Sequence, residues 1–410
     1  MIIEKRIKEF EKLGFGMFVH FGLYSLRGRG EWALHFDGDF DCYNSLIDVF
    51  DPKLSWADEL VSSAKAAGAK YITLTTRHHD GFSLYDTKGL SDFDAPHSAA
   101  KRDLIREFVD ACHKYGIIPF FYHTLLDWHV PEYKTDFKKY LIYLRKSVEI
   151  LCTEYGKIGG IWFDGMWDKK DEDWEEDALY SMIRRYQPDC MIINNTGLGA
   201  RGELGHIELD SVTFERGRPK PINLADSPKY IASEMCQIFA THWGYAKDDF
   251  CFKSLIQIIE DFCVCRRFGS NFLMNVGPMG DGSLRPLDKA MLLTLGEWEE
   301  KFKEALYLPD PTDISVENKE KDFILRGDGC YYLFCHDLIM VADANVALMG
   351  RDEESLYTSR FNFSEKVKSV SWLDSGAPLD FCDDNGKLTV KLTPYTYGEQ
   401  LVVRVAKIEI

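Results

Sequence analysis

The N-terminal three quarters of the chain alternates short apolar runs with longer segments of helical periodicity. The short runs are bounded by glycine or by polar residues, which is typical of buried strands. Between them, apolar residues recur every three to four positions, as on the buried face of an amphipathic helix. The runs predict strands at 15–20, 71–75, 117–122, 161–163, 190–193 and 271–276, and helices at 56–67, 103–115, 137–155, 178–186, 253–268 and 287–305.

This alternation predicts an α/β fold with a parallel sheet, and the number of repeats favours an irregular (β/α)8 barrel over an open sheet. The segment 309–313 is a plausible linker, because it holds two prolines among polar residues. Beyond it the apolar pattern has a period of two, with short runs separated by turn signals. The runs at 323–325, 331–335, 367–372, 388–392 and 400–405 predict a small C-terminal β-sandwich. We therefore expect a barrel domain at 1–308 and a β-sandwich domain at 309–410.

Polar side chains follow the carboxyl ends of the predicted barrel strands. They are His20, His78, His79, His123, Asp164 and Asn194. In (β/α)8 barrels this end of the strands carries the active site. Asp164 is the central candidate, because a carboxylate at the end of a buried strand is costly unless it is paired or used. The alternative is that Asp164 only caps the following helix.

The composition excludes several classes of function. A net charge of −17 argues against a nucleic-acid partner, since phosphate binding needs a basic surface. No run of eighteen apolar residues is present, so we expect no membrane partner. The N-terminal residues do not resemble a signal peptide, which predicts a cytoplasmic protein. The eleven cysteines are scattered and odd in number, so we interpret them as reduced and mostly buried.

No motif for a metal or a cofactor is convincing. His78, His79 and Asp80 form the most plausible metal site, but neighbouring residues of a strand point to opposite faces. A barrel metallohydrolase therefore stays a weak alternative, and we expect neither a metal nor another cofactor. Two histidines near aromatic residues, such as Tyr85 and Trp128, are instead typical of a sugar site. The glycine-rich segment 277–282 lacks the spacing of a nucleotide-binding loop and is interpreted as a turn.

Carboxylates are the remaining candidates for chemistry. Cleavage of a glycosidic bond needs two of them, one that attacks or activates water and one that protonates the leaving oxygen. Asp164 is the first, and Glu31, Glu215 and Glu234 are candidates for the second. Their spacing in the sequence does not decide among the three.

At this point the sequence resembles the α-L-fucosidases of glycoside hydrolase family 29 over nearly its whole length. The resemblance rests on several short motifs in the right order, which include Phe18-Val19-His20, Gly30-Glu31-Trp32, His78-His79-Asp80-Gly81-Phe82 and Trp162-Phe163-Asp164-Gly165. Further matching stretches are 67–71, 125–128 and 271–278. Each motif alone is short, but their common order is specific.

The resemblance implies a retaining exo-glycosidase on an irregular barrel with a C-terminal β-sandwich and no metal. Its substrate would be a fucosylated oligosaccharide or glycoconjugate. The resemblance does not indicate an oligomeric state. Asp164 matches the nucleophile of the family, and Glu215 is the expected acid/base. Glu234 is the second candidate for the acid/base, and it also resembles a residue that helps to line the site in the family. The residues that match sugar-binding groups are His20, Glu31, Trp32, His78, His79, Tyr122 and Trp162.

Two positions depart from the family pattern. Phe21 stands where a tryptophan is usual, and we expect it to make the pocket wall smaller. Thr196 stands where many members have an arginine, which suggests that no arginine lies near Asp164. These departures keep two alternatives open: the same mechanism on a related sugar, such as an α-L-galactoside or a substituted fucoside, or a carbohydrate-binding relative without activity.

Overall fold

A computed structural model describes residues 2–196, 202–225, 227–340 and 357–410. The chain divides into two compact units, each of which draws on two segments of the sequence. The first unit comprises Met1–Lys253 and Ser270–Thr294, and the second comprises Ser254–Gly269 and Leu295–Ile410. A domain boundary between residues 308 and 309 stays a prediction.

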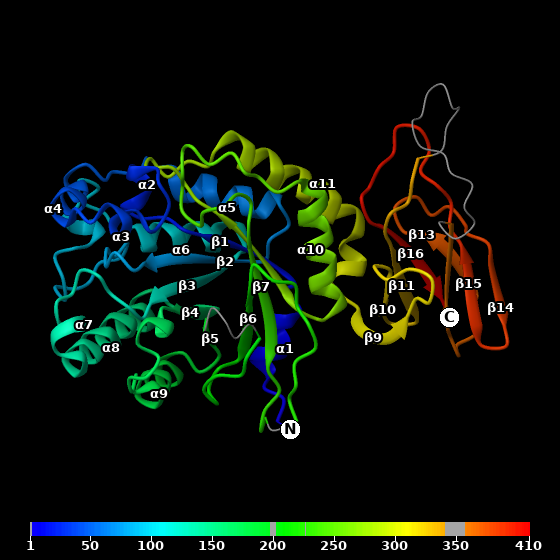
Figure 1. The fold of residues 1–410 in the computed structure, drawn as a ribbon, viewed down its shortest axis with the longest axis horizontal. Coiled ribbons are helices and arrows are strands. Elements are labelled where there is room, and N and C mark those ends of the chain that lie inside the picture. The colour runs from blue at the N-terminus through cyan, green and yellow to red at the C-terminus, as the bar shows by residue number, and fades with distance from the viewer. Residues whose placement is uncertain (1, 197–201, 226, 341–356) are drawn as a thin grey trace. The chain divides into compact units, whose positions relative to one another are not determined.

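The core of the first unit is a closed barrel of eight parallel strands, which confirms the predicted fold class (Figure 1). Neighbouring strands follow each other in sequence order, and β8 pairs with β1 to close the sheet, with Phe272 opposite Phe15. The strands are β1 (Phe15–Val19), β2 (Tyr71–Arg77), β3 (Ile118–Thr124), β4 (Gly160–Asp164), β5 (Met191–Asn194), β6 (Ser211–Glu215), β7 (Ala232–Ile238) and β8 (Asn271–Val276).

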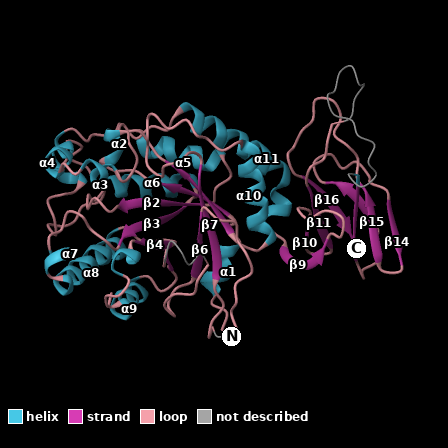
Figure 2. Ribbon diagram, in the orientation of Figure 1, coloured by secondary structure: helices cyan, strands magenta, loops and turns pink. Residues whose placement is uncertain are grey.

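Helices follow most of the strands and lie outside the sheet (Figure 2). They are α1 (Lys5–Glu11), α2 (Tyr24–Arg27), α3 (Ala33–Asp37), α4 (Phe40–Asn44), α5 (Trp56–Ala66), α6 (Leu104–Tyr115), α7 (Glu132–Thr135), α8 (Phe137–Glu154) and α9 (Glu176–Tyr186), with short 3-10 turns at Ser45–Asp48, Ala95–His97 and Met166–Lys169. Local chemistry sets their ends: the Asp103 carboxylate accepts the backbone N–H of Arg106 to start α6, and Gly116 ends it with φ of 66°.

Helices α2, α3 and α4 all belong to the long connection after β1. In Figure 1 they lie toward the end to which the arrows of β2 and β3 point. This connection therefore builds part of the wall around the carboxyl ends of the strands. Helix α10 (Leu255–Arg267) belongs to the second unit, and α11 (Pro286–Tyr307) begins in the first unit and ends in the second.

Large aromatic side chains fill the barrel interior. Phe18, Tyr71, Phe120 and Trp162 are buried there in one cluster. The ring of Tyr71 lies so close to β1 that a Cβ atom at Gly16 would come within 2.4 Å of its Cζ atom. Only glycine leaves room for the Tyr71 ring, so the glycine of the first strand is a packing requirement.

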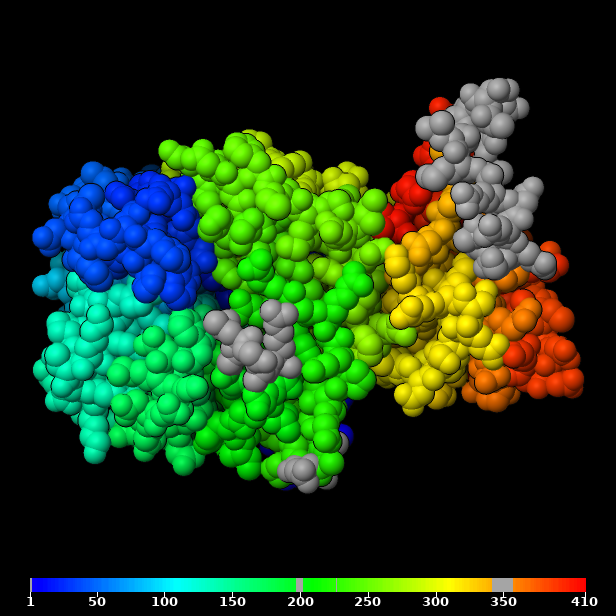
Figure 3. Space-filling model, viewed as in Figure 1, coloured from blue at the N-terminus to red at the C-terminus, as the bar shows by residue number. Residues whose placement is uncertain are grey.

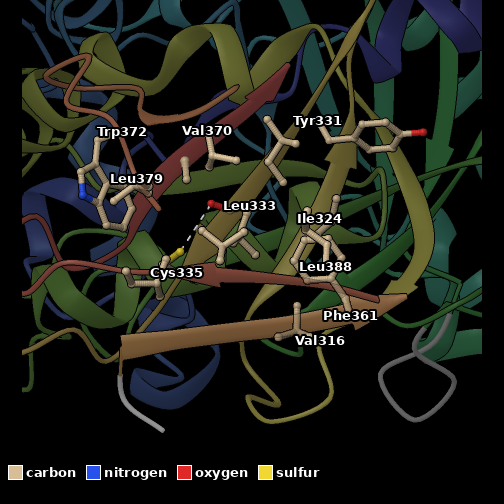
Figure 4. Close-up of a cluster of buried hydrophobic side chains, with 14 of the residues drawn as sticks. Val316, Ile324, Tyr331, Leu333, Cys335, Phe361, Val370, Trp372, Leu379 and Leu388 are labelled. Carbon is tan, nitrogen blue, oxygen red and sulfur yellow. Dashed lines mark hydrogen bonds between the residues drawn. The ribbon is translucent and has the colours of Figure 1, made fainter. Parts of the chain in front are cut away.

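The strands of the second unit form two antiparallel sheets, as predicted from the period-two pattern. One sheet has the order β13-β16-β11-β10-β9 and the other β12-β15-β14. The strands are β9 (Asp310–Ser315), β10 (Phe323–Arg326), β11 (Cys330–Cys335), β12 (Thr358–Asn362), β13 (Ser369–Trp372), β14 (Phe381–Asp384), β15 (Lys387–Lys391) and β16 (Arg404–Glu409). Buried side chains of both sheets, among them Leu333 and Leu388, form the core of this unit (Figure 4).

Candidate active site

A cavity of about 240 Å³ brings together residues from the carboxyl ends of several barrel strands and from the connections after them. The predicted site residues that line it are His20, Glu31, Trp32, His78, His79, Tyr122, Trp162, Asp164 and Glu215. The sequence analysis did not single out the other lining residues as part of a site, namely Phe18, Asn195, Trp167, Arg216, Cys236, Thr241, His242 and Trp243. The structure therefore places both leading carboxylates on one cavity.

The Asp164 carboxylate ends β4 and accepts four hydrogen bonds. Its Oδ1 atom accepts from the backbone N–H of Gly165 at 2.8 Å, from the Trp167 indole at 3.1 Å and from the Asn195 amide at 3.3 Å. Its Oδ2 atom accepts from the Tyr122 hydroxyl at 3.1 Å. Burial raises the pKa of Asp164 above its ordinary value, and the four donors oppose that rise by favouring the charged form. The carboxylate is thus held in place by both of its oxygens.

A single amide group connects Asp164 to Glu215. The Nδ2 atom of Asn195 lies 3.3 Å from Oδ1 of Asp164 and 2.8 Å from Oε2 of Glu215. Since one nitrogen touches both oxygens, these two oxygens lie within about 6 Å of each other. The Thr213 hydroxyl donates to Oδ1 of Asn195 at 3.2 Å, which turns the amide nitrogen toward the two acids. The two carboxylates are therefore fixed relative to one another.

The buried imidazole of His20 is a hydrogen-bond acceptor toward the cavity. Its Nδ1 atom lies 2.7 Å from Oδ1 of Asn275, whose Nδ2 atom donates to the carbonyl of Trp243 at 2.8 Å. Because the Asn275 oxygen can only accept, the Nδ1 atom of His20 carries the proton and Nε2 keeps its lone pair. Burial lowers the pKa of His20 to about 3, so the ring is neutral.

His79 has the same tautomer for a parallel reason. The Thr124 hydroxyl donates its proton to the carbonyl of Leu126 at 2.6 Å, so it accepts from Nδ1 of His79 at 2.7 Å. Burial and the neighbouring His20 lower the pKa of His79 to about 3. The bare Nε2 atom then lies 3.6 Å from Oδ2 of Asp164. Two acceptors face each other across this gap, which suits a donor such as a hydroxyl group of a substrate.

Aromatic rings form much of the cavity wall. Trp32 stacks against Trp167 with ring centroids 5.9 Å apart and meets Trp128 edge to face at 5.1 Å. Trp162 stacks against Tyr122 at 5.7 Å. Aromatic faces next to fixed polar groups are typical of sites that bind the apolar face and the hydroxyl groups of a sugar.

Glu31 contributes a buried carboxylate to the same wall. Its Oε2 atom accepts the backbone N–H of Gly244 at 2.8 Å, and burial raises its pKa. This bond connects the segment after β1 with the segment after β7. The predicted position of Glu31 at the cavity therefore depends on a contact between two segments that are far apart in the sequence.

Among the residues expected to act on or bind the sugar, Glu234 is the one that does not line the cavity. It lies on β7 inside the barrel, where one carboxylate oxygen accepts the Trp162 indole N–H at 3.0 Å and the other accepts the Tyr71 hydroxyl. Burial raises the pKa of Glu234 to about 7, against the opposing effect of the two donors. Both oxygens are bound to protein groups, so Glu234 supports the wall residue Trp162 from below.

His123 and Asn194 also lie away from the cavity, contrary to the expectation that all the polar strand ends gather there. His123 contacts the Ser147 hydroxyl at 2.8 Å, and Asn194 donates to the Tyr180 hydroxyl at 3.1 Å. Their side chains point to the helix side of the sheet, because neighbouring residues of a strand alternate between its faces. The next residue, Asn195, reaches the cavity instead.

The expectation that His78 and His79 point to opposite faces is wrong. Strand β2 ends at Arg77, so strand alternation no longer applies, and both rings line the cavity with centroids 4.1 Å apart. Burial lowers the pKa of His78 well below its ordinary value, and the two neighbouring histidines add to this effect. In the part of the chain that the structure describes, no three His, Cys, Asp or Glu side chains are arranged to hold a metal ion.

The two departures from the family pattern have different consequences from those expected. Phe21 is not part of the cavity wall, because its side chain packs on Phe50 and Trp56. Arg216, directly after β6, lines the cavity, so an arginine is present there even though residue 196 is a threonine.

A thiol lies among the carboxylates of the site. Cys236 on β7 is buried and lines the cavity. Burial raises its pKa well above the ordinary value, and the negative charges of Glu215, Glu234 and Asp164 raise it further. All eleven cysteines of the chain are free thiols, and Cys236 is one of the eight that are buried, in agreement with the prediction that most are buried.

Comparison with known proteins agrees with this fold and site. A family model described as alpha-L-fucosidase matches residues 3–304. The tissue alpha-L-fucosidase of Macaca fascicularis is 29% identical over 361 residues, which cover 80% of this chain and 75% of that protein. The structure of alpha-L-fucosidase isoenzyme 1 from Paenibacillus thiaminolyticus matches with a TM-score of 0.82 and 28% identity, over 99% of this chain and 98% of that chain.

A second similar structure is an alpha-L-fucosidase from Bacteroides thetaiotaomicron, solved as a trapped covalent intermediate with 2-fluoro-fucosyl fluoride in a glutamate-to-glutamine mutant. It is 22% identical, with a TM-score of 0.81 over 99% of this chain and 96% of that chain, and shows the shared fold. Because the family model spans most of the chain, the protein belongs to the α-L-fucosidase family of glycoside hydrolases.

Proposed function

We propose that the protein is a retaining exo-α-L-fucosidase, with Asp164 as nucleophile and Glu215 as acid/base. The observation that carries this proposal is the Asn195 amide, which holds both carboxylates on one cavity at 3.3 Å and 2.8 Å. Retaining glycosidases need their two carboxyl groups about 5–5.5 Å apart. The spacing of less than about 6 Å between the two bonded oxygens is compatible with that requirement.

In the first step, the ionised Asp164 attacks the anomeric carbon while Glu215 gives its proton to the departing oxygen. The Asn195 amide donates to Oε2 of Glu215 and so holds this carboxyl group next to Asp164. The C–O bond of the substrate breaks as the bond from Asp164 to the sugar forms. The products of this step are a fucosyl-enzyme ester and the protonated leaving group.

In the second step, Glu215 is ionised and takes a proton from water, which attacks the anomeric carbon and releases Asp164. The overall result is hydrolysis with retained configuration. The Bacteroides relative, solved as a covalent intermediate with a fluorinated fucosyl fluoride, supports this two-step scheme by its shared fold.

The assignment of Glu215 rather than Glu234 as acid/base rests on access. Glu215 lines the cavity. The two oxygens of Glu234 accept bonds from Trp162 and Tyr71 inside the barrel. Glu234 does not line the cavity, so its carboxyl group does not meet a glycosidic oxygen that is bound there.

Recognition of the sugar would use the neutral histidines and the aromatic walls. The bare Nε2 atoms of His20 and His79 would accept hydrogen bonds from sugar hydroxyls, and Trp162 and Trp32 would cover the apolar parts of the ring. A neutral set of acceptors suits fucose, which carries no charge. The terminal position of the sugar and a fucosylated glycan as substrate are part of this proposal, and so is a cytoplasmic location, which cell fractionation would test.

Variants of the two acids test the proposal with aryl α-L-fucosides. Asp164→Ala should abolish hydrolysis of both good and poor leaving groups. Glu215→Ala should slow a poor leaving group by on the order of 10²- to 10⁴-fold, and an activated nitrophenyl leaving group far less, because the latter needs no proton. Steady-state kinetics with a series of leaving groups measures this difference.

Two outcomes would contradict the assignment. If the wild-type protein cleaves aryl fucosides no faster than Asp164→Ala, the fucosidase proposal fails, and α-L-galactosides are the next substrates to assay. If Glu215→Ala loses the same factor with every leaving group, Glu215 is not the proton donor.

A further inference from the structure

A second cavity, of about 400 Å³, lies next to the catalytic one within the first unit. Its lining includes Arg29, Phe36, Asp37, His242, Asp248 and Asp249. His242 lines both cavities, so the two share a wall. Resting on the proposed fucosidase activity, we propose that this second cavity binds the leaving-group sugar, and that it selects a neutral sugar over a sulfated or sialylated one.

The shared wall is rigid. Asp249 accepts the backbone N–H of Thr241 at 2.8 Å, the backbone N–H of His242 at 3.2 Å and the Nδ1–H of the His242 ring at 2.8 Å. Gly30 packs against the same ring so closely that a Cβ atom there would lie 2.8 Å from Cδ2 of His242. The Nε2 atom of His242 is thus presented in a fixed direction, and its imidazole is half-exposed, as a group that hydrogen-bonds a bound hydroxyl must be.

A second link between the two cavities is aromatic. Trp32 lines the catalytic cavity, and its ring centroid lies 6.3 Å from that of Phe36, which lines the second cavity. Phe36 is 77% exposed, although it is a large apolar side chain. An exposed aromatic ring beside polar groups is a surface on which the apolar face of a sugar can stack. Trp32 and Phe36 thus place neighbouring aromatic rings on the catalytic cavity and on the second cavity.

The segments that build the second cavity come from two parts of the chain. Residues 28–37 follow β1 and residues 242–249 follow β7, and Arg29 pairs with Ala246 in an isolated antiparallel bridge. In Figure 3 the blue surface of the early segments meets the light green surface of the segments near residue 240. Glu215 and His242 both line the catalytic cavity, so the proposal places the leaving-group sugar between the oxygen that Glu215 protonates and the wall at His242.

The charge of the second cavity favours a neutral guest. Arg29 is bonded to Asp37, which also pairs with Arg27 at 2.8 Å. Asp248 and Asp249 add negative charge to the lining. Burial opposes ionisation of Asp249, but the bonds from His242 and from backbone N–H groups lower its pKa to about 2. A sulfate or a sialic acid carboxylate in this cavity would therefore meet like charge.

Phe36→Ala tests the subsite with two substrates. The first is an α-L-fucosylated neutral disaccharide, and the second is α-L-fucosyl fluoride, whose leaving group is too small to reach Phe36. We expect kcat/KM for the fucosylated disaccharide to fall about tenfold, mainly through KM, as for the loss of one stacking partner. The value for fucosyl fluoride should stay within about twofold. Phe250→Ala is the matched control, since Phe250 is 81% exposed and lines neither cavity.

Two results with Phe36→Ala would overturn the proposed subsite. One is an unchanged kcat/KM with both substrates, and the other is an equal loss of kcat/KM with both. Asp248→Asn tests the charge separately, because it should narrow the gap in kcat/KM between a neutral and a sulfated fucosylated disaccharide. An unchanged gap would overturn the selection by charge. If the wild-type protein cleaves neither fucosyl fluoride nor the disaccharide, the fucosidase proposal itself has failed, and this result differs from all the others.

Discussion

At the scale of single residues, Asn195 decides how the two acids face each other. Its amide nitrogen donates to both Asp164 and Glu215, and Thr213 holds its oxygen. A hydrogen bond to a charged group contributes about 1.5–3 kcal/mol. This one residue both sets the spacing of the carboxylates and favours the charged form of Asp164, the proposed nucleophile.

Replacing Asn195 with alanine should reduce kcat/KM on the order of 10- to 100-fold, because the bond to the charged Asp164 and the bond to Glu215 are both lost. The Asn195 bond lowers the pKa of Asp164. Its loss should therefore raise that pKa and move the acidic limb of the pH profile of kcat/KM to higher pH. The profile can be measured with an aryl α-L-fucoside from pH 4 to 8.

Asn194→Ala is the control for this experiment, because Asn194 bonds Tyr180 outside the cavity. It should leave the acidic limb in place. An Asn195→Ala enzyme with an unshifted acidic limb would show that the amide does not stabilise the charge on Asp164.

The sequence identifies some of these residues and misses others for physical reasons. Asp164 can be singled out because a carboxylate directly after a buried apolar run is costly to bury unless it is paired or takes part in function. Asn194 and Asn195 cannot be told apart in this way, since a shift of one position in the strand end reverses which side chain faces the cavity. His242 belongs to a connection without any periodic pattern, and only the contact between the segments after β1 and β7 reveals it.

At the scale of elements, Glu234 ties three strands together across the barrel interior. It lies on β7 and accepts bonds from Tyr71 on β2 and Trp162 on β4. Burial raises its pKa to about 7, from an ordinary value of 4.5. The folded protein binds this proton more tightly than the unfolded chain does, so protonation of Glu234 adds to the free energy of unfolding. This contribution is complete below pH 4.5 and is lost as the pH rises through about 7.

Glu234→Gln should remove this dependence. The glutamine carbonyl can accept from the Trp162 indole and its amide can donate to the Tyr71 hydroxyl, so both contacts persist without a titrating group. Between pH 5 and 7 the wild-type free energy of unfolding should fall by up to about 1.4 kcal/mol per pH unit relative to the variant. Urea denaturation at several pH values measures both proteins, and parallel pH dependences would contradict the role of Glu234.

In the barrel, the pattern of apolar residues predicts six of the eight strands but not β6 and β7, and in the second unit it misses β9, β12 and β14. Residues 310–313 of the predicted linker belong to β9. Strand β6 is Ser-Val-Thr-Phe-Glu and β7 contains Ser233, Glu234 and Gln237, so polar residues interrupt the apolar runs in both. Thr213, Glu215 and Glu234 are in these strands because the site and its support need them there. Strands such as β6 and β7, in which polar residues alternate with apolar ones, are thus hard to recognise from hydrophobicity.

At the scale of the whole molecule, the residues that line the catalytic cavity all belong to the first unit, and the second unit has a core of its own. Leu333 is fully buried in the centre of that core (Figure 4). Its side chain carries no part of the proposed chemistry. Stability and catalysis can therefore be altered separately in the two units.

We expect Leu333→Ala to lower the free energy of unfolding of the second unit by about 2–5 kcal/mol, because it leaves a cavity in a packed core. Activity at a temperature below the unfolding transition should stay at the wild-type level. Calorimetry and a fucoside assay measure the two effects, with Leu308→Ala, at a residue that is 77% exposed, as the control. A large loss of kcat in the folded variant would contradict the separation.

The buried thiol of Cys236 bears on the design of covalent inhibitors. Sulfur usually competes well with oxygen for an electrophile, but only as thiolate. Here burial and three neighbouring carboxylates keep the thiol protonated. With Asp164 as the proposed nucleophile, we expect a fucose-shaped epoxide or aziridine in this cavity to react with the carboxylate and not with the thiol. Reactive groups that are selective for oxygen nucleophiles should therefore label the protein here, and cysteine-directed groups should not.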